Sequence, residues 1–150
     1  MGLFGPERTV RKPLRLMAQD AEDLPPIAAL VQDAALRVGD MAFDPVGKHF
    51  TLRMNRFCHE SDDVAALRAP SVLRISCVER AQTFGLELSQ TGLVLSLLDI
   101  ALEPLEPPAF AMTLHFAGTH IRDVRLEVEC IDVLLMDLAA PRRAKSIPRH

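Results

Sequence analysis

The sequence predicts an α+β fold, in which a mostly antiparallel, curved or barrel-like sheet is covered by one N-terminal helix. Three observations lead to this prediction. Several segments alternate apolar and polar residues with a period of two, as half-buried strands do. One N-terminal segment instead has apolar residues at helical spacing. The chain also lacks the regular alternation of strands and helices that builds parallel sheets.

The helix signal follows a short expected strand at residues 14–18. Asp23 is suited to cap a helix, because its carboxylate can accept hydrogen bonds from free amides of the first turn. Pro25 and Pro26 then fall where a missing N–H group costs little. An apolar stripe at i, i+3, i+4 and i+7 follows. Its members are Ile27, Leu30, Val31 and Ala34.

The strand pattern shifts phase at Gly39 and Asp40. One extra residue in a strand produces such a shift, so we expect a strand at residues 36–43 with a β-bulge at Gly39, although a helix ending there is the alternative. Pro45 and Gly47 predict a turn at residues 44–47, with Pro fixing φ and Gly allowing a positive value. Residues 50–55 alternate cleanly and predict the second strand of a β-hairpin.

The remaining chain predicts further strands. Residues 61–70 are expected to form a loop, followed by strands at 73–77 and 84–88. Residues 93–102 are nearly all apolar, which favours a central strand covered on both faces, with a buried helix as the alternative. Segments 110–116 and 124–130 predict a second hairpin. Residues 131–138 fit a last strand or a short C-terminal helix.

The composition indicates one globular domain in a reducing compartment. A chain of 150 residues with 49% hydrophobic residues can bury a core of its own. We expect a flexible leader at 1–13, a single domain at 14–140 and a flexible basic tail at 141–150. Three cysteines without a pairing pattern, and an N-terminus without a signal-peptide apolar stretch, predict a cytoplasmic protein without a membrane segment. The net charge of -3 argues against a nucleic-acid partner.

Several motifs together resemble a family of small bacterial proteins catalogued as a domain of unknown function. The motifs are "LVQDAALRVGDMAF", "HFTLRMNRF" followed by Glu60, "VLSLLDIALEP" and "VRLEVECIDVLLMDL". The resemblance extends from about Leu14 to Leu138. It implies no reaction, cofactor or partner.

The polar segment Asn55 to Glu60 is the first candidate site. Cys58 and His59 are neighbours at a strand end, where successive side chains point in opposite directions, so a catalytic thiol–imidazole pair is disfavoured. Arg56 can bind a carboxylate or phosphate bidentately, and Asn55 offers both a donor and an acceptor. The structural alternative, which we favour, is that Arg56 pairs with Glu60 or with the acidic residues Glu127 and Glu129.

Two further carboxylates are candidates. Asp40 lies at the expected bulge, which can aim it at a site, although a role in the turn is the simpler interpretation. Asp99 interrupts an apolar strand and would point to function if it were buried. Cys77 and Cys130 fit small core residues. The histidines lack ligand spacing, and the chain has no cofactor motif, so neither a metal nor a cofactor is predicted.

These features favour a non-enzymatic module that binds another protein or forms a homodimer. The alternative is a ligand-binding protein or enzyme with a pocket at the strand ends near Arg56. A pocket lined by Arg56 together with Asp40 or Asp99 would support the alternative. The candidate binding residues are thus Asn55, Arg56, Glu60, Asp40 and Asp99.

Overall fold

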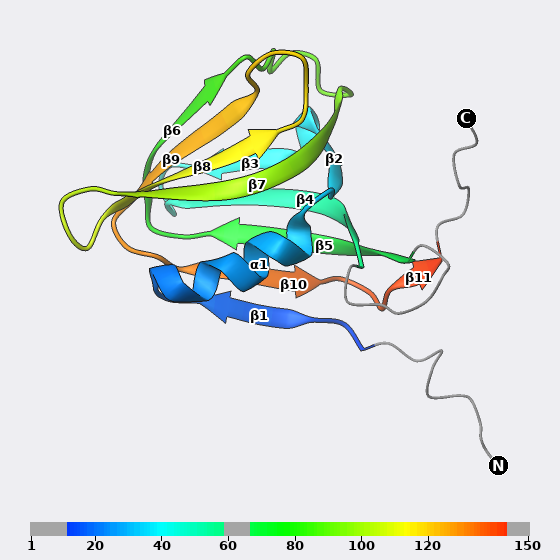
Figure 1. Ribbon diagram of the computed structural model, residues 1–150. Coiled ribbons are helices and arrows are strands. Elements are labelled where there is room, and N and C mark those ends of the chain that lie inside the picture. Colours follow the sequence, from blue (N-terminus) through cyan, green and yellow to red (C-terminus); the bar gives the residue numbers. More distant parts are fainter. Residues whose placement is uncertain (1–11, 59–66, 144–150) are drawn as a thin grey trace.

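A computed structural model describes residues 12–58 and 67–143, in which eleven strands form one antiparallel sheet (Figure 1). The strands are β1 (Arg15–Ala18), β2 (Ala35–Arg37), β3 (Met41–Asp44), β4 (His49–Phe57), β5 (Leu67–Ile75), β6 (Val78–Phe84), β7 (Val94–Pro104), β8 (Phe110–Phe116), β9 (Asp123–Val128), β10 (Val133–Asp137) and β11 (Arg142–Arg143). The helical elements are the 3₁₀ turns η2 (Ala21–Asp23) and η3 (Val38–Asp40) and the helix α1 (Leu24–Val31). The predicted α+β class with a mostly antiparallel sheet is therefore confirmed.

The sheet has the strand order β1-β10-β5-β4-β2-β7-β8-β9-β6, with β3 added to β4 and β11 added to β5. In the described part of the chain the end strands β1 and β6 each pair with one neighbour, β10 and β9. The sheet therefore stays open, and the barrel-like alternative is wrong in this respect. It is strongly curved, so that β6 to β9 form an upper layer over β5 and β10 (Figure 1).

Two chain segments pass side by side from one layer to the other. Only Ser76 and Cys77 separate β5 from β6, and the N–H of Ser76 donates to the Asp132 carbonyl, 2.9 Å away. The N–H of Glu129 donates in turn to the Cys77 carbonyl, also at 2.9 Å.

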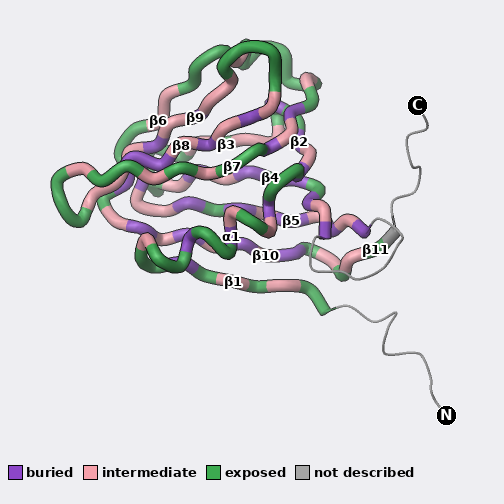
Figure 2. Tube along the Cα trace, viewed as in Figure 1, coloured by how far each residue is buried: buried purple, intermediate pink, exposed green. Residues whose placement is uncertain are grey.

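The core lies between the layers and beneath α1, and Figure 2 shows buried positions alternating along its strands.

The helix forms where predicted but is shorter. Asp20 caps the preceding turn η2, because its carboxylate accepts from the Asp23 N–H at 3.1 Å, while Asp23 makes no side-chain cap for α1. The helix buries Leu24, Ile27 and Val31. It ends at Val31, before Ala34, because Asp33 has a positive φ of 69° and its N–H donates to the Leu97 carbonyl.

The phase shift at Gly39 and Asp40 is a 3₁₀ turn and not a single-residue bulge. Ala35 of β2 lies opposite Asn55 of β4, and Met41 of β3 lies opposite Leu52 of the same strand. The six residue steps from Ala35 to Met41 therefore lie beside only three steps of β4, from Asn55 to Leu52. The extra residues form η3, which bulges out of the sheet. The hairpin of β3 and β4 is confirmed. Its positive φ, 60°, belongs to Lys48 and not to the predicted Gly47.

Several strand bounds differ from the prediction. Residues 67–70 belong to β5 and not to a loop, and the strand after it is residues 78–84 and not 84–88. The strand β7 is exposed along much of its length, so it is not covered on both faces. The hairpin of β8 and β9 is confirmed. The segment after it is the strand β10, and a C-terminal helix is not found in the described residues.

The chain ends fall partly outside the described residues. The predicted leader lies there except for residues 12–13, as does the tail after residue 143. Residues 142–143 of the expected tail form β11 and pair with β5. Within residues 12–58 and 67–143, no helix is long and apolar enough to cross a membrane.

Gly85 is the glycine whose replacement the fold tolerates least. Its φ of +71° is unfavourable for any side chain, and a Cβ atom would lie 1.7 Å from the Ile121 carbonyl oxygen. We expect Gly85→Ala to lower the free energy of unfolding by about 2–3 kcal/mol. Urea denaturation measures this, with Gly92→Ala as the control, because a Cβ there meets nothing within 4 Å. Equal losses in the two variants would contradict the expectation.

Candidate functional site

Arg56 belongs to a fully buried ion pair with Asp137. Its Nε donates to Asp137 Oδ1 at 2.8 Å and its Nη2 donates to Oδ2 at 2.9 Å, and both side chains are 0% exposed. Ser71 Oγ donates to Oδ1 at 2.6 Å, and the Leu14 N–H donates to Oδ2 at 2.9 Å. The carboxylate therefore joins β4, β5 and the segment leading into β1.

This pairing corrects two of the predicted partners of Arg56, Glu127 and Glu129. Glu127 belongs to β9 and pairs with Arg125 at 2.6 Å, and Glu129 lies 3.3 Å from Lys48. The third predicted partner, Glu60, lies outside the described residues. Sequence reasoning missed Asp137, although a signal was present. Arg56 continues the buried phase of Phe50, Leu52 and Met54, and Asp137 continues that of Val133 and Leu135. Each of these charged residues stands at a buried position of an otherwise apolar alternating pattern. Such a pattern predicts that the two form a buried ion pair, because neither charge is stable alone in the core.

The network holds a carboxylate ionised in the core. Burial by itself raises the pKa of Asp137, but hydrogen bonds from Arg56, Ser71 and the Leu14 N–H outweigh it and lower the pKa below its ordinary 3.8. A carboxylate held in this way is a poor general base and is closed to solvent. The network therefore fixes the positions of strands and is not suited to catalysis.

The lowered pKa predicts a pH dependence. A group whose pKa is depressed by folding stabilises the protein above its unfolded pKa, and this contribution is lost as the pH falls through the folded pKa. We expect the stability difference between the wild type and Asp137→Asn to be constant from about pH 8 to pH 5 and to shrink below about pH 4. Urea denaturation across this range measures it, and a difference that widens in acid would contradict it.

The outer face of the sheet is rich in arginine. On β4 the side chains of Thr51, Arg53 and Asn55 alternate with the buried ones and point away from the core. Residues opposite each other in a sheet share a face, so the pairing registers extend this face across neighbouring strands. We call the arginines on it the basic face: they are Arg15, Arg37, Arg53, Arg68, Arg74 and Arg142.

The arginines of the basic face form no ion pairs in the described part of the chain, where none of them has a carboxylate partner. Arg68 lies over the Phe57 ring, 5.6 Å from its centroid, and donates to the Asn55 carbonyl. Arg74 Nη2 lies 2.7 Å from His49 Nε2. The acidic Asp44 shares this face at the hairpin turn, where it accepts from the Val46 N–H.

Arg37 and Arg53 come together on this face. The pairing registers align Arg15, Met136, Val72 and Arg53 in one row, and they place Arg37 opposite Val94. β2 pairs with β4 at Ala35 and Asn55, and Arg37 and Arg53 each lie two residues from this pair on the same outer face. Like charges close together on a sheet face repel each other. The pair of Arg37 and Arg53 therefore has no evident role in stability.

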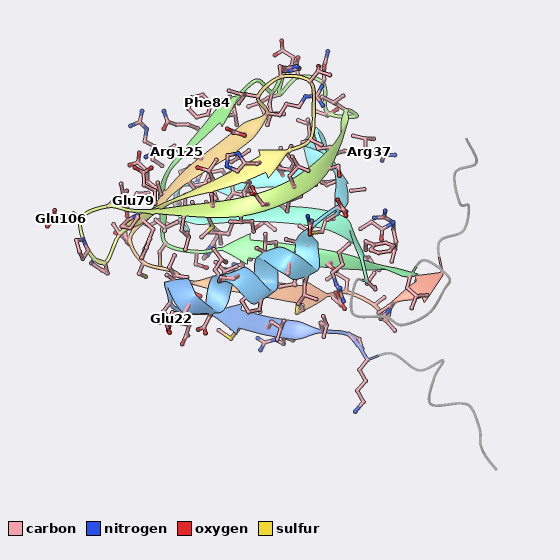
Figure 3. All side chains as sticks on the ribbon, in the orientation of Figure 1. Glu22, Arg37, Glu79, Phe84, Glu106 and Arg125 are labelled. Carbon is pink, nitrogen blue, oxygen red and sulfur yellow. The ribbon has the colours of Figure 1, made fainter. Side chains whose placement is uncertain are left out.

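A cleft of about 530 Å³ lies at this pair. It is lined by Ala35, Leu36, Arg37, Asp40, Arg53, Met54, Asn55, Pro70, Ser71, Val94 and Leu138. Figure 3 shows Arg37 beside β2, at the opposite end of the molecule from Glu79 and Glu106. Two predicted residues, Asn55 and Asp40, thus come together, whereas Arg56 and Asp99 do not line this cleft.

Asp40 and Asp99 have different surroundings. The Asp40 carboxylate accepts from the Arg37 N–H at 2.9 Å, which closes the turn η3, as the simpler interpretation expected. The Asp99 side chain is 66% exposed on β7, with its Oδ1 4.0 Å from His115 Nε2. Exposed Asp99 therefore carries no functional argument.

Two of the cysteines lie side by side, and the third is buried. Cys77 and Cys130 are half-buried, with sulfur atoms 3.5 Å apart, so they lie at the edge of the core and not inside it. Burial and the hydrogen bond with Cys130 raise the pKa of Cys77 to about 11, which leaves it protonated at neutral pH. Cys58 is buried, and its neighbour His59 lies outside the described residues.

Comparison with known proteins gives one match. Neither the curated proteins nor the solved structures include a significant match to this chain. A family model does match, and it spans residues 14–150. The predicted resemblance to a domain of unknown function is thereby confirmed. The chain belongs to the family described as "Protein of unknown function (DUF2948)".

Proposed function

We propose that this protein is a non-enzymatic interaction module that binds an acidic segment of another protein on its basic face. The observation that carries the proposal is that Arg37 and Arg53 line one cleft, are exposed and have no carboxylate partner in the described chain. Two arginines close together on one face repel each other, and an acidic partner would relieve this repulsion.

The composition of the face favours a protein over a nucleic acid. Between the arginines lie the apolar side chains of Met17, Val72, Leu134 and Met136. Arginine and methionine are enriched in protein interfaces. Single-stranded nucleic acids instead bind to surfaces with exposed aromatic rings, and the Phe57 ring is half-buried under Arg68.

The face also favours a different protein over a second copy of the chain. A two-fold dimer places the same surface of both subunits in contact. Two basic faces would then bring arginines against arginines, which costs free energy. We therefore assign the basic face to a foreign partner, and any homodimer would use another surface.

Binding of a model peptide tests this function. The probe is a fluorescent, terminally blocked peptide in which glutamates are interspersed with leucine and serine, and fluorescence anisotropy measures its affinity. We expect affinity that falls with added salt. Arg53→Glu combined with Arg74→Glu should weaken binding at least about tenfold, because two contacts become repulsive. The matched control is Arg80→Glu on β6, an exposed arginine outside the basic face.

Three results would count against this function. The first is an equal loss in the control and the double variant. The second is equal affinity for a peptide with glutamine in place of glutamate. The third is tighter binding of single-stranded oligouridylate than of the acidic peptide at the same salt concentration, which would indicate a nucleic-acid partner.

A further inference from the structure

We infer that the cleft between Arg37 and Arg53 is the anchor site of the basic face and receives one glutamate or aspartate side chain with an apolar residue beside it. This inference rests on the proposed function and adds the chemistry of the partner.

The donors converge from two strands. Arg37 on β2 and Arg53 on β4 line the same cleft. Asn55 follows Arg53 on the same face, and its side-chain amide has no hydrogen bond within the described residues. Two guanidinium groups and an amide can surround both oxygens of a carboxylate.

The charge of the cleft fits one carboxylate. Asp40 lines the same cleft and brings a negative charge beside the two arginines. The formal sum is one positive charge, which matches a carboxylate and leaves a doubly charged phosphate in excess. Because Asp40 already accepts from the Arg37 N–H at 2.9 Å, it is held in place and cannot swing away from an incoming group.

The apolar wall fits a neighbouring side chain. Val94 and Leu138 line the cleft and are 59% and 46% exposed, which is unusual for large apolar residues. Val94 belongs to β7 and pairs with Arg37, and Leu138 directly follows β10. Ligand sites combine such apolar walls with a few convergent polar groups. A segment with an acidic and an apolar residue in succession satisfies both parts.

The buried network fixes one wall of this site. Ser71 lines the cleft and donates to Asp137 Oδ1, and it lies opposite Met54, another lining residue. The N–H of Leu138 donates to the Pro70 carbonyl at 2.7 Å, directly after Asp137. Arg56 and Asp137 are therefore positioning residues for the cleft and do not touch its contents.

A peptide with a single carboxylate tests the inference. The probe is a terminally blocked Ser-Leu-Glu-Leu-Ser peptide, titrated into ¹⁵N-labelled full-length protein and followed by NMR. We expect shift changes at Arg37, Arg53, Asn55 and Val94, and affinity at least about tenfold weaker for the glutamine analogue. Arg53→Gln and Val94→Ser should each weaken binding, whereas Arg74→Gln, on the same face but outside the cleft, should not.

The outcomes separate this inference from the proposed function. If Arg53→Gln and Arg74→Gln weaken binding of the single-glutamate peptide equally, the assignment of the anchor site is wrong. Binding of the fluorescent peptide with several glutamates would then still support the basic face. If that fluorescent peptide fails to bind, both proposals are wrong. If isovalerate binds as tightly as the peptide, the cleft is a site for a small organic acid and the peptide assignment is overturned. Folding of each variant is checked by its circular dichroism.

Discussion

Replacing Asp137 by alanine is expected to lower the free energy of unfolding by about 3–5 kcal/mol. The variant leaves the Arg56 guanidinium without its carboxylate in the core, where the side chain is 0% exposed. It also removes one of the two acceptors of Ser71 Oγ and the acceptor of the Leu14 N–H. Both the loss of this buried ion pair and the lost hydrogen bonds favour the unfolded state.

Urea denaturation at neutral pH measures this loss. The matched control is Asp99→Ala, the same substitution at a carboxylate that is 66% exposed, which should change stability by less than about 0.5 kcal/mol. A loss at Asp137 as small as that at Asp99 would mean that the buried pair is not formed in solution.

Removing both charges together is expected to restore much of this loss. Arg56→Met alone leaves a buried, unpaired carboxylate and should cost about 3–5 kcal/mol. The double variant Arg56→Met, Asp137→Leu fills similar space with apolar side chains and buries no charge. Its stability should exceed that of either single variant, with a coupling energy of about 2–3 kcal/mol between the two positions.

A double-mutant cycle of the wild type, both single variants and the double variant gives the coupling energy. Additive losses would show that the two side chains do not act as a pair. The double variant also separates stability from function. Since Arg56 and Asp137 position the wall of the cleft through Ser71, we expect a stable protein with a weakened response to the single-glutamate peptide.

Local patterns in the sequence were sufficient to predict most elements. The alternation of Phe50, Leu52 and Met54 with polar residues correctly placed β4, and the alternations of β8 and β9 predicted their hairpin. These patterns succeed because one face of a strand is buried. They gave the strand β7 but not its exposure, and they missed residues 67–70 of β5, where Pro70 lies inside the strand.

The candidate site was predictable in part. Asn55 and Asp40 were singled out by residue type and do line one cleft. Arg37 and Arg53 were missed, because each appears in the sequence as an ordinary exposed arginine. The overall charge of -3 also concealed the basic face, since the acidic residues that produce it are concentrated elsewhere in the chain.

The sequence by itself determined the class of fold, the hairpins and the buried phase on which Arg56 lies, because these depend on residues close together along the chain. Tertiary structure alone decided that Asp137 pairs with Arg56 across 81 residues, and that Arg37 and Arg53 line one cleft. Strand order and register set both results. They arise from the packing of the whole core, which no local pattern contains.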